Sequence, residues 1–194
     1  DRILSALSGQ SLLRQFVQLE GTNELDIRYR ITTNHPDHQI NWYNPGTGNG
    51  EHVGWYYELP AATERMVNNP RVADGIVSFI STAMTAPMCS SGFRSYIHAL
   101  DACSGNRLNL PYFNINGDLL LNSGDLINIG TVDDEDIQVP VSAVSREGRL
   151  FMGSALAVGE DGGITLFTNS SGEIEPIVTK PEQLGITHWR EIRD

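Results

Sequence analysis

The stretch PYFNINGDLLLNSGDLINIG, residues 111 to 130, spaces oxygen-bearing side chains as a twelve-residue calcium-binding loop does. In such loops the ligands come from positions 1, 3, 5, 7, 9 and 12, position 7 contributes its backbone carbonyl, and position 6 favours glycine. The spacing therefore predicts a Ca²⁺ site. Its six ligands would be Asn114, Asn116, Asp118, Leu120 through its carbonyl, Asn122 and Asp125.

The residue types in this loop fit calcium less well than their spacing does. Calcium affinity depends on the number of carboxylate ligands, and here only Asp118 and Asp125 supply one. Leu119 stands at the sixth position, where it resists a tight turn. Two interpretations stay open: a weak calcium site of the extracellular kind, and a turn without metal that asparagine side-chain hydrogen bonds hold together.

The charge balance excludes several classes of partner. The chain carries 24 acidic and 13 basic residues, a net charge of −11, and Lys180 is its single lysine. Nucleic-acid binding requires concentrated basic residues, so we expect no nucleic-acid partner, and little attraction to anionic lipid. No apolar run is long enough to span a membrane. Because Asp1 is not followed by a signal sequence, we expect a processed product or an excerpt of a longer protein.

The elements that would position these residues are short strands. Gly, Pro, Asn and Asp separate runs rich in β-branched and aromatic residues, which is typical of antiparallel strands, so the predicted fold class is mainly β. One short amphipathic helix is expected within residues 5–21, where apolar residues lie near helical spacing. The predicted strands lie within residues 25–32, 75–84, 94–101, 136–144, 149–158 and 163–169.

A long segment, residues 34–60, is rich in Gly, Asn, Pro and aromatic residues. Loops of this length are usually functional or packed by their own aromatic side chains, so both packing against the sheet and a binding surface stay open. Three histidines in the segment could in principle bind zinc, but they lack a metal-specific spacing. These histidines are His35, His38 and His52.

Two further features leave alternatives open. Cys89 and Cys103 can form a disulfide only if the loop around Cys89 folds back along the strand between them. The acidic run TVDDEDIQ, residues 131–138, is typical of a solvated loop between two strands, and could instead lend a carboxylate to the loop at residues 114–125.

The segment YIHALDACSGNRL, residues 96–108, is similar to the repeated signature of quinoprotein-type β-propeller blades, in which a strand ends in Leu-Asp-Ala before a Ser-Gly turn. Asp101 and Ser104 would accept hydrogen bonds from the turn backbone, and Gly105 would supply a positive φ. A weaker copy of this sequence pattern lies about ninety residues upstream, a distance of roughly two blade periods. At that period the chain is too short for a complete propeller.

Five short sequence motifs, in a fixed order along the chain, give a second resemblance. The motifs are SLLRQ, GWYYELPAATERMVNNPRV, CSSGFRSYIHALDACSGNRL, FNINGDLLLNSGD and HWREI. In this order they resemble the C-terminal propeller of the PilY-type tip proteins of type IV pili, from about Ser11 onward. The family pattern has Asp at the first and ninth positions of the calcium loop, where this chain has Asn114 and Asn122.

The resemblance implies an incomplete β-propeller, with residues 1–194 as a single domain that forms the C-terminal part of a PilY-like propeller. It implies a non-enzymatic role in pilus biogenesis, tip capping or surface adhesion through protein contacts. The implied partners are minor pilins or other pilus-tip proteins and the remainder of the propeller chain. The implied location is the pilus at the cell surface, reached through the periplasm. Ca²⁺ is the one candidate cofactor, and it rests on the loop spacing, with the turn without metal as the alternative.

Two other function classes are alternatives. The chain has no GxSxG phrase and no histidine in a recognisable catalytic phrase, so a hydrolase is not expected. A quinoprotein dehydrogenase fragment shares the blade signature, but such enzymes bind their quinone and calcium with residues of a complete ring. A calcium-stabilised carbohydrate-binding or surface-binding module would use the aromatic loop, with Trp42 and Trp55 as candidate contacts.

Overall fold

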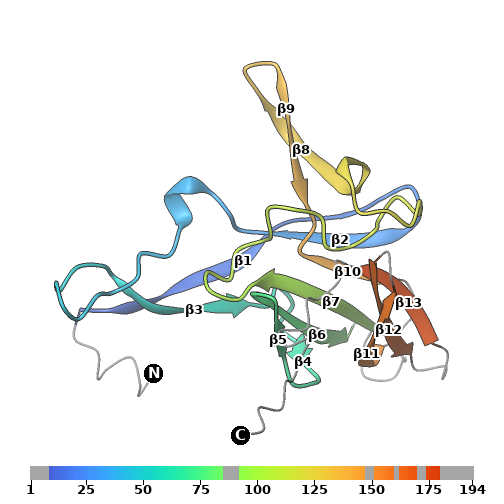
Figure 1. The fold of residues 1–194 in the computed structure, drawn as a ribbon, viewed down its shortest axis with the longest axis horizontal. Coiled ribbons are helices and arrows are strands. Elements are labelled where there is room, and N and C mark those ends of the chain that lie inside the picture. The colour runs from blue at the N-terminus through green and yellow to red at the C-terminus, as the bar shows by residue number, and fades with distance from the viewer. Residues whose placement is uncertain (1–8, 85–91, 147–150, 160–161, 170–173, 180–194) are drawn as a thin grey trace, which may run out of the picture.

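The computed structural model describes residues 9–84, 92–146, 151–159, 162–169 and 174–179. The described residues form strands and two short 3-10 helices, and the curled main sheet is consistent with an incomplete propeller, so the predicted fold class is confirmed (Figure 1). The elements are β1 (Ser11–Thr22), β2 (Ile27–Thr32), η2 (Pro36–His38), β3 (His52–Glu58), β4 (Arg65–Met66), β5 (Arg71–Ala73), β6 (Ile76–Met84), β7 (Phe93–Asp101), η3 (Ser123–Asp125), β8 (Leu126–Val132), β9 (Glu135–Pro140), β10 (Ala143–Arg146), β11 (Phe151–Gly159), β12 (Gly162–Asn169) and β13 (Ile174–Thr179).

The main sheet has eight strands in the order β3-β1-β2-β10-β7-β6-β4, and β5 also pairs with β6. The neighbouring pairs are antiparallel except β1 and β3, which run parallel. β10 lies between β2 and β7 although it follows β2 by more than a hundred residues. A three-stranded sheet, β11-β12-β13, and the two-stranded ribbon β8-β9 complete the described strands.

All six predicted strand segments contain strands, and residues 136–144 contain parts of two, β9 and β10. The helix expected within residues 5–21 is wrong, because β1 occupies most of that segment. β1 pairs with β2 on one side and with β3 on the other, so its backbone groups are hydrogen-bonded within the sheet. This pairing outweighs a helical spacing of apolar residues that Gly9 already weakened.

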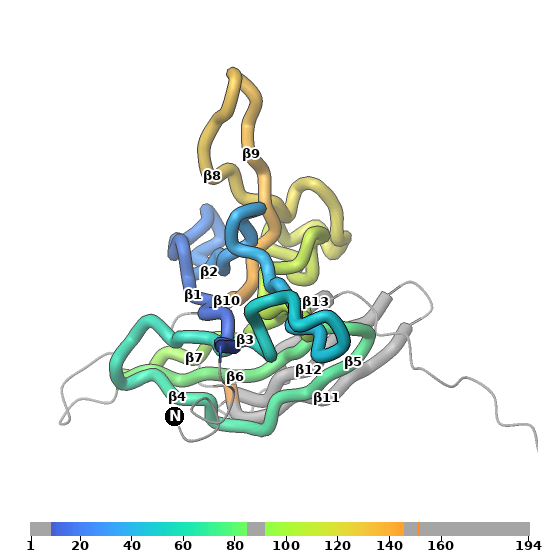
Figure 2. The backbone as a smooth tube through the Cα atoms, turned by 90° about the vertical axis from the view of Figure 1, so that its left-hand side faces the viewer, coloured from blue at the N-terminus to red at the C-terminus, as the bar shows by residue number. Residues whose placement is uncertain are grey.

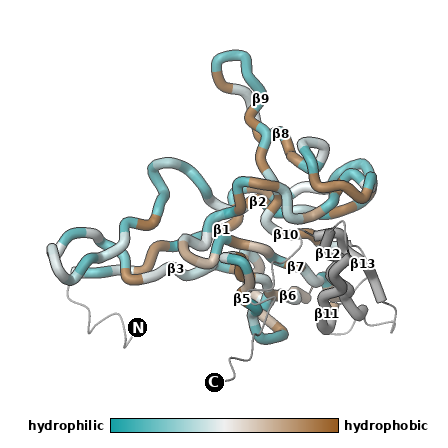
Figure 3. The backbone as a smooth tube through the Cα atoms, viewed as in Figure 1, coloured by the Kyte–Doolittle hydropathy of each residue, from teal (hydrophilic) through white to brown (hydrophobic). Residues whose placement is uncertain are grey.

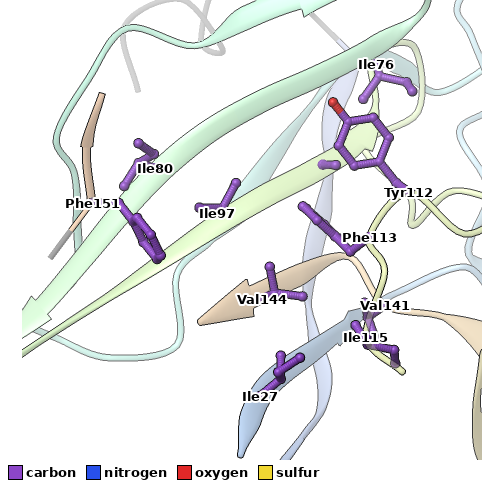
Figure 4. Close-up of a cluster of buried hydrophobic side chains, with 11 residues drawn as sticks. Ile27, Ile76, Ile80, Ile97, Tyr112, Phe113, Ile115, Val141, Val144 and Phe151 are labelled. Carbon is purple, nitrogen blue, oxygen red and sulfur yellow. The ribbon is translucent and has the colours of Figure 1, made fainter. Parts of the chain in front are cut away.

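The hydrophobic core lies between the main sheet and the segment that leads into the asparagine-rich loop, residues 114–125 (Figure 4). Tyr112 and Phe113 from that segment, and Ile115 from the loop itself, are at most 4% exposed. They pack with side chains of β2, β6, β7 and β10 and with Phe151 of β11. Burial of these large apolar side chains anchors the first residues of the loop to the sheet.

The ribbon β8–β9 projects from the main sheet (Figures 1 and 2). Its turn contains Asp133 and Asp134, whose φ angles are 51° and 64°. The acidic run therefore forms a turn between two strands, as predicted, and its side chains are exposed. Hydrophobic stretches lie along the stem of the ribbon, and its tip is hydrophilic (Figure 3). Across the described part of the chain, no helix has the length and apolar character needed to cross a membrane.

Candidate functional site

The structure brings the six predicted ligand positions of the asparagine-rich loop together. The loop begins next to the buried Phe113 and ends in η3, which leads directly into β8. The side-chain amide nitrogen of Asn114 donates to Asp118 Oδ1 at 2.9 Å and to the Leu120 carbonyl at 2.8 Å. It also lies 3.3 Å from Asn116 Oδ1. The first, third, fifth and seventh positions therefore converge on one point, and that point is an amide nitrogen.

Asp125, at the twelfth position, is fully buried and closes the loop. Its Oδ1 accepts the backbone N–H groups of Ile115 at 2.8 Å and Asn116 at 3.3 Å. Its Oδ2 accepts the N–H of Asn122 at 3.0 Å. Asn122 and Asp125 also form a capping box around η3. The bonds from Ile115 and Asn116 to Asp125 tie the two ends of the loop together.

Asp118 is exposed, and N–H groups of the loop surround its carboxylate. Oδ1 accepts the Leu120 N–H at 2.7 Å as well as the Asn114 amide, and Oδ2 accepts the side-chain amide of Asn122 at 2.9 Å. The Leu120 N–H and then the Asn122 amide lower the pKa of Asp118 below its ordinary value, because they stabilise the charged form. The carboxylate of Asp118 is therefore hydrogen-bonded on both oxygens by N–H donors of the loop itself.

The loop keeps the backbone turn of a calcium loop in spite of its leucine. Leu119, at the sixth position, has a φ of 65°, which is in the left-handed region that favours glycine. Two side chains support the turn, since Asn114 Oδ1 accepts the N–H of Gly117 at 2.9 Å and Asn116 Oδ1 accepts that of Asp118 at 3.0 Å. The second of these bonds forms an Asx turn, and both stabilise such a backbone locally.

In this arrangement the donor set does not fit a bound Ca²⁺. The carboxylates of Asp118 and Asp125 already accept N–H groups on both oxygens, and the amide nitrogen of Asn114 faces the oxygens that would coordinate the ion. A hard cation requires oxygen ligands directed at it. Four of the six predicted positions meet at the Asn114 amide, and calcium binding by the six residues stays an untested prediction.

The three histidines of the long loop do not form a zinc site, because no group of three or more His, Cys, Asp or Glu residues within the described ranges could hold a metal ion. His38 bonds the Arg14 carbonyl at 2.6 Å, and His52 Nδ1 accepts the N–H of Asn41 at 2.9 Å. Trp55 donates to the Ala102 carbonyl at 3.1 Å, which supports packing against the sheet for this part of the loop. Trp42, by contrast, is 50% exposed.

The predicted blade turn is confirmed at the end of β7. Asp101 Oδ1 accepts the N–H groups of Cys103 at 3.0 Å and Ser104 at 2.7 Å, and also the Ser104 hydroxyl at 2.7 Å. Gly105 has a φ of 71°, and a Cβ atom there would lie 2.4 Å from the Trp55 ring. These residues have the structural role that the sequence predicted. Cys103 is exposed, and Cys89 lies outside the described residues, so the pairing of the two cysteines stays open.

A second polar cluster, Arg30, Glu64, Ser81 and His98, lies within the sheet. Arg30 donates to both oxygens of Glu64, at 2.6 and 3.0 Å, and Ser81 donates to Glu64 Oε1. Ser81 Oγ lies 2.8 Å from His98 Nε2, and the His98 ring stacks on Phe79 with ring centroids 4.4 Å apart. Sequence reasoning missed this cluster because its members are far apart in sequence.

This buried cluster contains the residue types of a hydrolase site without its geometry. Glu64, Ser81 and His98 are at most 1% exposed, so no substrate reaches them. Ser81 donates its proton to Glu64 and not to a histidine base, and His98 Nδ1 has no hydrogen-bond partner among the described residues. Burial, and then the charge of Arg30, hold the pKa of His98 well below its ordinary value, so His98 is neutral at pH 7. The cluster is structural.

Comparisons with known proteins give a likeness of fold. No protein-family model matches the chain, and no curated protein matches it. Among solved structures, the chain is similar to the Pseudomonas aeruginosa PilY1 C-terminal domain, with a TM-score of 0.63 and 19% sequence identity. The match covers 90% of this chain and 32% of that chain, so this protein spans about a third of its length. The chain therefore has the fold of part of the PilY1 C-terminal domain.

Proposed function

We propose that this protein is a PilY-like, type IV pilus-associated protein that acts without catalysis, through protein contacts in pilus biogenesis, tip capping or surface adhesion. The observation that carries the proposal is the fold likeness to the PilY1 C-terminal domain over 90% of the chain. A fold alone does not imply a function. The ordered series of PilY-like sequence motifs is a second line of support. Minor pilins or other pilus-tip proteins, and the remainder of the propeller, are the proposed partners at the cell surface.

The projecting ribbon β8–β9 is the surface best suited to such contacts. Ile129, Val132 and Ile137 are 37–57% exposed on it, although a two-stranded ribbon gains stability only when its apolar face is covered. Residues 126–140 carry four carboxylates and no basic residue. A partner that offers an apolar surface beside basic side chains would complement this ribbon.

Two polar arrangements among the described residues are held by contacts within the fold. The cluster around Glu64 and His98 is closed to solvent, and the carboxylates of the asparagine-rich loop are occupied by N–H groups. Neither arrangement offers an accessible base next to a nucleophile, which a hydrolase requires.

A carbohydrate-binding or surface-binding module is the second candidate, and the exposed rings of Trp42 and Tyr56 favour it. On a glycan array, a signal that disappears in Trp42→Ala and persists in Trp55→Ala would support this candidate. Trp55 is the control because its indole is bonded to the Ala102 carbonyl and packs against the blade turn.

The pilus proposal is tested by deleting the gene in its own organism and counting surface pili by electron microscopy. We expect pili to be lost or reduced, the wild-type gene to restore them, and a variant with Asp133→Lys and Asp134→Lys to restore them poorly. A matched charge control is Glu24→Lys with Glu51→Lys, two exposed carboxylates on other loops, which should restore pili fully. Normal pilus number and normal pilus-dependent surface attachment in the deletion strain would refute the proposal.

A further inference from the structure

We propose that the asparagine-rich loop folds without a cation, and that the side-chain amide of Asn114 takes the position that Ca²⁺ has in a calcium loop. The first observation is the convergence of ligand-type oxygens on a nitrogen atom. Asn114 Nδ2 lies 2.8–3.3 Å from Asp118 Oδ1, the Leu120 carbonyl oxygen and Asn116 Oδ1. An amide nitrogen carries two hydrogens, so it attracts these oxygens by hydrogen bonds, as a cation would attract them by its charge.

The orientation of the Asn114 amide is set by its other end. Its Oδ1 accepts the N–H of Gly117 at 2.9 Å, so the oxygen faces the backbone and the nitrogen faces the loop centre. Turning the amide over would leave the Gly117 N–H without its partner. It would also direct an oxygen at the three oxygens that now accept hydrogen bonds, which is unfavourable in the absence of a cation.

The remaining ligand positions are occupied in the same way. Asn122 directs its amide nitrogen at Asp118 Oδ2, at 2.9 Å, while its own oxygen accepts the N–H of Gly124 at 2.6 Å. Both oxygens of Asp125 accept backbone N–H groups. Each of the six positions thus offers a ligand-type oxygen that already accepts at least one hydrogen bond. A calcium ion would have to displace several hydrogen bonds before it could coordinate the two carboxylates of Asp118 and Asp125.

The consequence concerns regulation. A calcium loop with four or five carboxylates repels itself in the absence of the ion and becomes ordered when the ion binds. In this loop the two asparagines remove negative charge and supply the N–H donors that the ion would otherwise replace. The loop lies between the core segment at Phe113 and the projecting ribbon, so it would hold the ribbon in place at any calcium concentration. This inference does not depend on the pilus assignment.

The experiment is calcium titration by calorimetry and thermal unfolding of the full chain, with EDTA, CaCl₂ or MgCl₂. Wild-type protein should give no saturable heat at millimolar Ca²⁺ and the same Tm in all three conditions. Asn114→Ala should lower Tm by about 4–8 °C, because the hydrogen bonds of its side chain to Asp118, the Leu120 carbonyl and the Gly117 N–H are lost. Calcium should not restore that loss.

A double variant provides the converse. Asn114→Asp with Asn122→Asp removes both central N–H donors and raises the carboxylate count to four, so its Tm should fall in EDTA and rise again with Ca²⁺ but not with Mg²⁺. The control is Asn128→Asp, which adds a carboxylate on the adjacent strand β8 outside the loop and should create no calcium response. Saturable Ca²⁺ binding by the wild type, with a Tm increase that EDTA reverses, would overturn the proposal.

A spectroscopic measurement keeps the proposal testable even if the variants are unstable. In a ¹⁵N–¹H correlation spectrum, the Asn114 side-chain amide protons should exchange slowly with solvent and keep their shifts when EDTA is replaced by Ca²⁺. Rapid exchange of these protons in EDTA, or a calcium-dependent change in their shifts, would show that the amide does not occupy the centre of the loop.

Discussion

Removal of the Glu64 carboxylate tests how the main sheet tolerates a buried charge. Arg30 is 3% exposed and donates two hydrogen bonds to Glu64, and its guanidinium also lies 3.4 Å above the Tyr96 ring centroid. In Glu64→Ala, the two Nη donors and the Ser81 hydroxyl lose their common acceptor. Glu20 still bonds Arg30 Nε, but its side chain is 47% exposed and solvated.

The expected cost follows from the burial of this pair. Breaking a buried ion pair by removing one partner costs about 3–5 kcal/mol, because the remaining charge has no compensation. With an m value of about 2 kcal/mol per molar, the urea midpoint should fall by roughly 1.5–2.5 M. A replacement of both partners, Arg30→Met with Glu64→Leu, should lie much closer to the wild type, since it leaves no buried charge unpaired.

The assay is equilibrium urea unfolding followed by tryptophan fluorescence, with an exposed ion pair as the matched control. Arg14 and Glu58 form such a pair, with side chains 54% and 50% exposed. Glu58→Ala should therefore cost less than about 1 kcal/mol. If Glu64→Ala and Glu58→Ala cost the same, or if the double replacement is as unstable as Glu64→Ala, the assignment of a buried, mutually dependent pair is wrong.

Three further predictions concern the sheet and its turns. Because His98 has a pKa well below its ordinary value in the folded protein, the unfolded chain binds a proton at His98 first as the pH falls. The contribution of neutral His98 to the free energy of unfolding is complete above about pH 6.5 and decreases by up to about 1.4 kcal/mol per pH unit below it. Urea titrations from pH 7.5 to 5 should show this slope, and His98→Phe should lack it. Gly105→Ala should lower the free energy of unfolding by at least about 2 kcal/mol in the same assay, because it combines a positive φ with a Cβ atom 2.4 Å from the Trp55 ring. Gly48→Ala is the control and should lower it less, because Gly48 has a positive φ but open space around it. Burial, opposed by a hydrogen bond from Thr32, raises the pKa of Tyr57 to about 12, so an alkaline absorbance titration should find a tyrosine that ionises late and is lost in Tyr57→Phe.

The strands could be predicted from the sequence because their signals are local. β6 and β7 are runs of β-branched and apolar residues bounded by turn residues, and both appear within a residue or two of the predicted bounds. β1 could not be predicted in the same way, since its structure depends on pairing with β3, some forty residues later. The insertion of β10 between β2 and β7 is non-local for the same reason.

In the candidate site, too, local features could be predicted from the sequence and non-local contacts could not. In the asparagine-rich loop, four of the six predicted positions meet at the Asn114 amide, because this turn geometry is encoded within a few consecutive residues. The direction of the Asn114 amide depends on the Gly117 N–H and on the Leu120 carbonyl, whose positions are fixed only in the folded loop. The pairing of Arg30 with Glu64 joins a strand to a loop 34 residues later, and a lone glutamate among polar residues gave no signal for it.

The most direct test of the proposed function is immunogold electron microscopy of native pili with antibodies against this protein. The account predicts gold particles on the pili, concentrated at their ends, and no labelling in the deletion strain. Pili that carry no label, while the same antibodies detect the protein elsewhere in the cells, would contradict it.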